Sequence, residues 1–279
     1  MTEKPWQIVD VSAVAPLTDL EFIQFQKLML EVAGITLSNE KKPLVAGRLT
    51  KRIRECGLST FSQYLQRLQG RERGEELQRA LDLLTTNETY FFREPKHFDF
   101  LSANILPHCR PGQGFRIWSA ACSSGEETYS IAMTLAETLD YGCWSVLGSD
   151  LSTRVLDKAR SGHYPLERAK DIPKPLLSRY CLKGIGSQEG TFLMDRKLRA
   201  CTEFLQVNLN APLPNLGLFD VIFLRNVMIY FSQDTKRAVV ARLLPLLKSG
   251  GYFFVGHSES LNGITTALES IMPAIYKKP

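Results

Sequence analysis

The sequence predicts an α/β fold in which a parallel sheet is covered by helices on both faces and is preceded by a small all-helical domain. Up to about Leu84, apolar residues recur at helical spacing and strand-like runs are absent. From Phe115 onward, short apolar runs alternate with helical segments, the pattern of strands and crossover helices in a parallel sheet. A chain of 279 residues is long enough to hold both parts.

The composition is typical of a globular protein, with 44% hydrophobic and 23% charged residues. We expect neither a secretion signal nor a membrane-spanning segment, because no apolar run is long enough. The six cysteines are scattered without a C-x-x-C pair, which favours reduced thiols in a cytoplasm. None of the four histidines has another histidine or a cysteine at ligand spacing, so no metal site is expected. The net charge of +5 permits an acidic partner without demanding one.

The amino-terminal domain is expected to span residues 1–84 and to contain four helices. The first helix has Gly34 at the position where a left-handed residue commonly ends a helix. The second carries Val45, Leu49 and Ile53 in one apolar stripe. The expected helices are Leu20–Val32, Lys41–Glu55, Phe61–Leu68 and Glu75–Leu84.

The second domain is expected to span residues 115–279, after a linker and connecting helix at 85–114. Its strands are predicted from short apolar runs: Phe115–Ala120, Trp144–Ser149, Glu203–Val207, Phe219–Leu224, Tyr252–Gly256 and Ala274–Lys277. Its helices are predicted at Glu126–Leu139, Thr153–Ser161 and Thr235–Leu247. The stretch at about 162–202 is too long for a connection and holds a short helix, Pro173–Tyr180, and a glycine-containing loop between strand-like pieces. It predicts an inserted small β-subdomain.

The loop after the first predicted strand, Ala121–Ser130, is where an open parallel sheet binds ligands. A dinucleotide site would show G-x-G-x-x-G, whereas this loop contains Gly125 alone. Glu126 and Glu127 would also repel a phosphate at the start of the helix. A dinucleotide is therefore disfavoured.

S-adenosylmethionine fits this loop better, because it has no phosphate and carries a sulfonium and an ammonium group. Glu126 or Glu127 would pair with the ammonium, and the sequence does not decide between them. Asp150 ends the second strand, where a carboxylate can accept hydrogen bonds from both ribose hydroxyls. The alternative is that the two glutamates only complement the helix dipole.

Polar residues also follow the third and fourth strands. Asn208 is placed to bind the edge of an adenine, or else is an ordinary turn residue. Arg225 and Asn226 emerge after a buried run and should face the cofactor cleft, although a surface arginine at a strand end is the alternative for Arg225.

Four motifs together resemble the motif set of the CheR-type chemotaxis receptor methyltransferases: Thr85–Arg93, Ala120–Glu127, Arg225–Phe231 and Gly256–Glu259. They occur in the order of that family, and the resemblance runs from the first helices to near the carboxyl end. It implies a Rossmann-like S-adenosylmethionine-dependent methyltransferase sheet with an inserted β-subdomain, after a helical domain. It also implies methylation of glutamate side chains on bacterial chemoreceptor helices, with S-adenosylhomocysteine as the product.

The resemblance further implies which residues bind the cofactor. Asn87, Thr89 and Arg93 would approach it from the interdomain linker, and Asn208 and Leu209 would lie at the adenine. The remaining implied contacts are Glu127 with the methionine part, Asp150 with the ribose, and Arg225 and Asn226 at the catalytic face.

A glutamate substrate explains why no Asp–His pair is evident in these motifs. A carboxylate with a pKa of about 4.3 is already ionised near neutral pH, so methyl transfer needs in-line placement and exclusion of water rather than a general base. Arg225 or Arg93 would steer the carboxylate, and Tyr230 would donate a hydrogen bond to it. A nucleic-acid methyltransferase is disfavoured because valine and methionine follow Asn226, not two prolines and an aromatic residue. The alternatives are a non-catalytic S-adenosylmethionine-binding adaptor, or a methyltransferase of another protein or of RNA.

The stretch from Lys41 to Arg54 is basic and contains no acidic residue. On a helix, Lys41, Arg48 and Arg52 align along one edge, with Lys51 and Arg54 further round. This surface is either a solvated helix face or a docking ridge for an acidic receptor helix, and the resemblance implies the second. Such a ridge would mainly raise the encounter rate and select the orientation.

The loop Lys183–Gly190 is the other candidate for partner binding. It is either a simple hairpin turn or, as the resemblance implies, a site where a receptor carboxyl-terminal tail peptide adds a strand. The glycines of this loop are Gly184, Gly186 and Gly190. We expect a monomer that neither binds nucleic acid nor inserts into a membrane.

Overall fold

The computed structural model describes residues 14–70, 73–109 and 114–279. The chain divides into two compact units, the first ending at Thr85 and the second beginning at Thr86. None of the described helices is both long and apolar enough to cross a membrane.

The first unit is helical, and its first helix begins and ends at strong local signals. Thr18 caps the helix through a capping box with Glu21, and Gly34, with φ 71°, ends it in the left-handed conformation. Phe25 and Leu49 are fully buried in the core that the helices share. The helices of this unit are α1 (Asp19–Ala33), η1 (Asn39–Lys41), α2 (Lys42–Glu55), α3 (Phe61–Gln69) and α4 (Arg73–Leu84).

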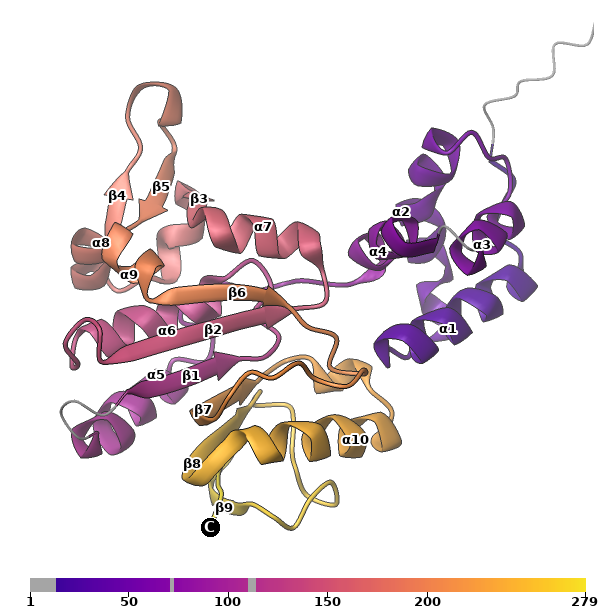
Figure 1. The fold of residues 1–279 in the computed structure, drawn as a ribbon. Helices are drawn as coiled ribbons and strands as arrows, with labels where there is room; N and C mark the ends of the chain where they lie inside the picture. Colours follow the sequence, from indigo (N-terminus) through magenta and orange to yellow (C-terminus); the bar gives the residue numbers. More distant parts are fainter. Residues whose placement is uncertain (1–13, 71–72, 110–113) are drawn as a thin grey trace, which may run out of the picture. The chain divides into compact units, whose positions relative to one another are not determined.

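The second unit contains a seven-stranded sheet in the order β6-β2-β1-β7-β8-β10-β9. The five strands from β6 to β8 are parallel, and β10 and β9 are antiparallel to their neighbours. The strands are β1 (Phe115–Ser119), β2 (Trp144–Asp150), β6 (Thr202–Gln206), β7 (Phe219–Leu224), β8 (Leu247–Val255), β9 (Glu269–Met272) and β10 (Ile275–Lys277). The carboxyl ends of the parallel strands therefore meet at one edge of the sheet (Figure 1).

Helices cover both faces of this sheet, as Figure 1 shows for α6 and α10. The crossover from β1 to β2 and the crossover from β7 to β8 run in opposite directions, so two right-handed connections place their helices on opposite faces. Tyr129 of α6 donates a hydrogen bond to the carbonyl of Ala159 in α7, which keeps these two helices together. The helices are α5 (Lys96–Phe100), η2 (Leu101–Ile105), η3 (Leu106–His108), α6 (Glu126–Ala136), α7 (Thr153–Ser161), η6 (Met228–Tyr230), α10 (Gln233–Leu243) and η7 (Leu244–Leu246).

Between α7 and β6 lies the inserted subdomain, built on a three-stranded antiparallel sheet in the order β3-β5-β4. Its hairpin projects away from the large sheet (Figure 1). The elements of the insertion are β3 (His163–Pro165), η4 (Leu166–Asp171), α8 (Lys174–Tyr180), β4 (Cys181–Lys183), η5 (Gly186–Gln188), β5 (Thr191–Met194) and α9 (Arg196–Ala200).

The structure differs from the sequence predictions at a few element ends. The helix expected to reach Leu247 ends at Leu243, because Pro245 cannot donate within a helix and clashes with the preceding turn. Strand β8 begins at Leu247 rather than Tyr252, since Gly250 and Gly251 interrupt the apolar pattern without interrupting the strand. Strand β9 was not predicted, because its residues are mostly exposed and show no alternation. The helix expected at Glu126–Leu139 ends at Ala136.

Candidate active site

The turn from β1 into α6 is shaped by Gly125. This residue has φ 95°, a conformation that favours glycine, and a Cβ there would lie 2.8 Å from the Cβ of Ala159 and 2.9 Å from the hydroxyl of Tyr164. The glycine therefore allows α7 and β3 to pack against the turn. The adjacent Ser123 is also left-handed, with φ 50°.

Asp150 ends β2 next to this turn. Its Oδ2 accepts a hydrogen bond from the backbone N–H of Ser123 at 2.9 Å, and its Oδ1 accepts one from the N–H of Ser152 at 2.9 Å. These two bonds orient the carboxylate at the carboxyl end of β2, and each carboxylate oxygen can accept more than one hydrogen bond. The hydroxyl of Ser123 donates to the carbonyl of Asn87 at 2.9 Å, which ties the segment before the sheet to the same turn.

Glu127 faces the carboxyl edge of the sheet. Its Oε1 accepts from the hydroxyl of Ser119 at 2.6 Å, and its Oε2 accepts from Nη1 of Arg225 at 2.9 Å. Burial raises the pKa of the Glu127 carboxyl, and Arg225 opposes that shift.

Glu126 points elsewhere, toward the inserted subdomain. It is 1% exposed, accepts a hydrogen bond from the hydroxyl of Ser124 at 2.7 Å and lies 3.5 Å from Nη1 of Arg168. Burial raises the pKa of this carboxyl as well. Of the two adjacent glutamates, Glu127 is the one that joins the residues at the ends of β1 and β7.

Arg225, the residue after β7, is 4% exposed and joins two carboxylates. Its Nη1 donates to Glu127, and its Nη2 donates to Oε2 of Glu94 at 2.9 Å and to the carbonyl of Arg93 at 2.5 Å. Arg225 keeps the pKa of Glu94 at about 2, against the effect of burial. We refer to Glu94, Glu127 and Arg225 as the Arg225 cluster, whose formal charge is −1 (two carboxylates and one guanidinium).

Glu259 fixes the loops that follow β7 and β8. Its Oε2 accepts from the N–H groups of Asn226 at 2.8 Å and Gly256 at 2.7 Å, and its Oε1 accepts from the N–H of Ile229 at 3.2 Å. A Cβ on Gly256 would lie 2.5 Å from Nδ2 of Asn226, so a glycine is needed for this close approach. Asn226, held in this way, donates from Nδ2 to Oε1 of Glu94 at 3.2 Å.

Backbone strain is concentrated at this edge. Among the described residues, five that are not glycine have a positive φ, and Phe92, Glu94, Ser123 and Asn226 are four of them. Each such conformation costs on the order of 1 kcal/mol, and strained residues cluster at functional sites. The backbone N–H of Ser123 donates to Asp150 and that of Asn226 donates to Glu259, which holds two of these conformations in place.

His97 lies against Glu94 at the base of the site. It is 1% exposed, and its Nδ1 is 3.5 Å from Oε2 of Glu94. Burial, with a further contribution from Arg225, lowers the pKa of His97 to about 3, so the ring is neutral and a weak base. Its ring centroid lies 4.9 Å from that of His257, on the loop after β8.

Sequence reasoning missed Glu94, His97, His257 and the anchoring role of Glu259. Glu94 directly follows the motif that ends at Arg93, and His257 and Glu259 lie inside the motif Gly256–Glu259. The only sign in the sequence was that these residues lie inside or next to a motif. That position does not reveal which side chains contact one another in the fold.

The other predicted site residues occupy the surroundings of this cluster. Arg93 is half-buried, donates to the carbonyl of Glu88 at 3.1 Å and lies 5.7 Å from the centroid of the Tyr90 ring. Thr89 accepts a hydrogen bond from Arg168 at its carbonyl. Tyr230 is half-buried on η6.

Asn208 and Leu209 follow β6, which pairs with β2. The side chain of Asn208 accepts a hydrogen bond from the N–H of Asn210 at 2.9 Å, the geometry of an Asx turn, and Leu209 is buried. The turn role left open by the sequence is thus present at Asn208.

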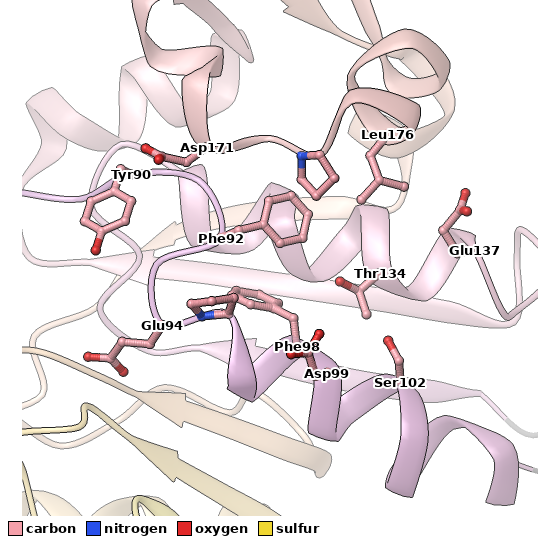
Figure 2. A pocket seen from close by; sticks show the side chains of 12 residues that line it. Tyr90, Phe92, Glu94, Phe98, Asp99, Ser102, Thr134, Glu137, Asp171 and Leu176 are labelled. Atoms are coloured by element: carbon pink, nitrogen blue, oxygen red, sulfur yellow. The ribbon is translucent and has the colours of Figure 1, made fainter.

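A cavity of about 410 Å³ lies beside the Arg225 cluster and shares Glu94 with it (Figure 2). It is bounded by the segment leading into α5, by α6 and by the inserted subdomain. The described lining contains four acidic residues and no basic one. The lining residues are Tyr90, Phe92, Glu94, Pro95, Phe98, Asp99, Ser102, Thr134, Glu137, Asp171, Pro173 and Leu176.

The predicted docking residues lie on α2 of the helical unit, apart from Lys41 at the end of η1, and they are not equivalent. Arg52 is bound by the buried Glu76, with N···O distances of 2.6 and 2.9 Å. Arg48 donates to the carbonyls of Leu84 and Thr85 at the end of α4. Both arginines therefore stabilise the unit itself, and the exposed basic residues of the predicted ridge are Lys41, Lys51 and Arg54.

In the inserted subdomain, the predicted tether glycines lie in the loop between β4 and β5. Gly186 and Gly190 have φ 58° and 81°. A Cβ on Gly184 would collide with the carbonyl of Gln188. Ile185, which lies between Gly184 and Gly186, is 83% exposed.

Comparison with known proteins identifies the class and then the family. Residues 87–276 match the family profile described as CheR methyltransferase, SAM binding domain, and residues 20–85 match CheR methyltransferase, all-alpha domain. The second unit is therefore the S-adenosylmethionine-binding domain of a methyltransferase. The chain belongs to the CheR methyltransferase family.

Curated relatives match over most of the chain. It is 44% identical to the chemotaxis protein methyltransferase of Escherichia coli (strain K12), covering 88% of this chain and 86% of that protein. It is 41% identical to chemotaxis protein methyltransferase 2 of Pseudomonas aeruginosa, covering 92% of each chain. The chemotaxis protein methyltransferase of Borreliella burgdorferi is 38% identical, covering 94% of this chain and 95% of that protein.

Proposed function

We propose that this chain is a protein-glutamate O-methyltransferase that transfers the methyl group of S-adenosylmethionine to glutamate side chains of chemoreceptors. The products are glutamyl methyl esters and S-adenosylhomocysteine. The family and its chemotaxis relatives support this assignment.

The observation that carries the proposal is the Arg225 cluster at the carboxyl edge of the sheet, beside Asp150. The cluster has a formal charge of −1, and the cofactor has a net charge of +1 from its sulfonium, ammonium and carboxylate groups. Asp150 places a carboxylate at the carboxyl end of β2, and a carboxylate in that position suits a ribose diol. The donor set thus fits a cationic nucleoside rather than a phosphate.

Within this site we assign the ammonium contact to Glu127. Its carboxylate lies at the ends of β1 and β7, whereas Glu126 is turned toward Arg168. Arg225 lowers the cost of keeping Glu127 ionised, and Ser119 orients it.

The chemistry needs no base from this chain. S-adenosylmethionine supplies an electrophilic methyl group on a sulfonium; the new O–C bond forms as the C–S bond breaks, and the electron pair returns to sulfur. The substrate carboxylate is ionised near neutral pH, and His97, with a pKa of about 3, is a poor proton acceptor. The chain therefore has to exclude water and orient the carboxylate, for which Arg93 and Tyr230 are our candidates.

For the receptor contacts we propose two surfaces. An acidic helical bundle would face three exposed cations, Lys41 at the end of η1 and Lys51 and Arg54 on α2. The loop holding Ile185 and the strands beside it would accept a receptor tail peptide by strand addition. The cytoplasmic location and the monomeric state remain predictions.

The proposal is tested by methyl transfer from labelled S-adenosylmethionine to a purified chemoreceptor cytoplasmic fragment. An ester label should be released by mild base as volatile methanol, and a base-stable label would refute O-methylation. Asp150→Asn should reduce labelling through weaker cofactor binding. The matched control is Asp157→Asn on α7, whose side chain is 76% exposed and pairs only locally with Arg160.

A further inference from the structure

His97 and His257, whose side chains the proposed methyl transfer does not use, form with Glu94 a cluster of potential metal ligands. Each offers one donor atom, and these atoms all lie within 4.8 Å of one another. His97 and His257 are far apart in the sequence, and the packing of α5 against the loop after β8 brings their rings together. We refer to these residues as the Glu94–His97–His257 cluster.

The state of His97 is a second and independent observation. The side chain is 1% exposed, yet neither ring nitrogen has a hydrogen-bond partner within the described chain. Leaving a buried polar group unsatisfied costs about 1–3 kcal/mol, so native proteins seldom do this without a reason. Nδ1 of His97 faces Oε2 of Glu94 at 3.5 Å, and the rings of His97 and His257 are in edge contact.

One of the three donor distances is already close to that in a coordinated site. Imidazole nitrogens and carboxylate oxygens bind Zn²⁺ at about 2.0–2.2 Å, which places neighbouring ligand atoms roughly 3.3 Å apart. The pair Glu94–His97 is already near this separation. His257 is exposed, so its ring can turn to complete a three-ligand site with one position open to water.

Arg225 binds the same carboxylate and is the cation with which a metal ion would compete. Its charge is matched by Glu127 as well as by Glu94, and the three groups together carry a formal charge of −1. Oε2 of Glu94, the oxygen 3.5 Å from Nδ1 of His97, accepts from Arg225 at 2.9 Å, so an ion bound there would displace the arginine from it. Oε1 accepts longer bonds, at 3.2 Å, from Asn226 and from the backbone N–H of His257.

We infer that Glu94, His97 and His257 bind a divalent transition-metal ion such as Zn²⁺, and that this ion inhibits methyl transfer. Two imidazoles and a carboxylate are a donor set that zinc commonly uses. The ion would compete with Arg225 and Asn226 for Glu94, and it would change the local charge from −1 to +1 beside the place of a cationic cofactor. The inhibition, but not the binding, rests on the function proposed above.

Metal binding is tested on the full chain after treatment with a chelator, by titration with Co²⁺ and then with Zn²⁺. The unmodified chain should bind one ion with the visible absorption of tetrahedral cobalt. His257→Ala should weaken binding at least tenfold, while the matched control His108→Ala, an exposed histidine on η3, should bind as the unmodified chain does. Equal binding by both variants would overturn the inference. So would a near-ultraviolet thiolate band that persists in His257→Ala, because the ion would then be on cysteine.

Inhibition is measured separately, as the Zn²⁺ concentration that halves methyl transfer relative to each variant's metal-free rate. The unmodified chain and His108→Ala should be inhibited near their metal dissociation constants, and His257→Ala should need at least ten times more Zn²⁺. Unchanged turnover with the site filled would refute the inhibitory role. A chain that transfers no methyl group under any condition would refute the proposed function, while the cobalt titration would still decide the metal site.

Discussion

Replacing Arg225 with methionine removes the cation that Glu94 and Glu127 share, and it keeps a side chain of similar length in the buried position. Arg225 is 4% exposed and donates three hydrogen bonds, to the two carboxylates and to the carbonyl of Arg93. Removing one partner of a buried ion pair costs about 3–5 kcal/mol. We expect part of this cost as a lower unfolding temperature and part as weaker cofactor binding.

The cofactor part follows from the protonation of Glu127. Burial already raises the pKa of this carboxyl while Arg225 opposes the shift, so the substitution raises the pKa further. A neutral Glu127 cannot pair with an ammonium group, and the loss of one charged hydrogen bond is worth about 1.5–3 kcal/mol, or roughly 10- to 150-fold in Kd.

The assay is calorimetric titration with S-adenosylhomocysteine across a range of pH. Affinity should rise with pH as Glu127 ionises, and in Arg225→Met this rise should occur at higher pH than in the unmodified chain. Arg225→Lys, which keeps the charge but reaches one carboxylate, should fall between the two. The matched control is Arg160→Met on α7, whose side chain is 46% exposed. Binding by Arg225→Met within about threefold of the unmodified chain, with an unmoved pH profile, would show that Glu127 does not depend on Arg225.

Three further outcomes are expected. Asp150→Ala should weaken S-adenosylhomocysteine binding by at least tenfold in calorimetry, because two hydroxyl acceptors are lost; an unchanged Kd would contradict the ribose assignment. In the helical unit, Arg52 holds the pKa of Glu76 at about 2, as Arg225 does for Glu94. Because Glu76 takes up a proton as the pH falls from about 4.5 to 2, acid should remove about 2 kcal/mol of that unit's stability. Denaturation followed between these pH values should show no such loss in Glu76→Gln. Lys51→Glu combined with Arg54→Glu should raise the receptor KM in low salt without changing cofactor affinity, and parallel loss of both would argue against a docking ridge.

Much of the fold was predictable because local patterns and tertiary structure agree. The buried runs of β1, β2 and β7 are continuous and apolar, as parallel strands covered on both faces must be. The capping signals at Thr18 and Gly34 mark the first helix. The prediction failed at β9 and at the start of β8, where exposure and paired glycines hide the strand pattern and sheet pairing decides the structure.

The docking stretch shows a limit of another kind. Charge spacing on α2 aligned Arg48 and Arg52 with Lys41, but spacing cannot tell which cations are satisfied inside the protein. The partners of the two arginines, the carbonyls at the end of α4 and the carboxylate of Glu76, come from a segment more than twenty residues away.

The sequence by itself determined the family, the kind of cofactor and the residues at each strand end, because the motifs lie where a parallel sheet must present its loops. It could not decide between Glu126 and Glu127. Consecutive helical residues differ by about 100° in direction, and the packing of α6 on the sheet sets which one faces the cleft. The tertiary structure alone joined Glu94 to Arg225 and His97 to His257, since side chains so distant in sequence meet only when the strands and loops that carry them are packed together.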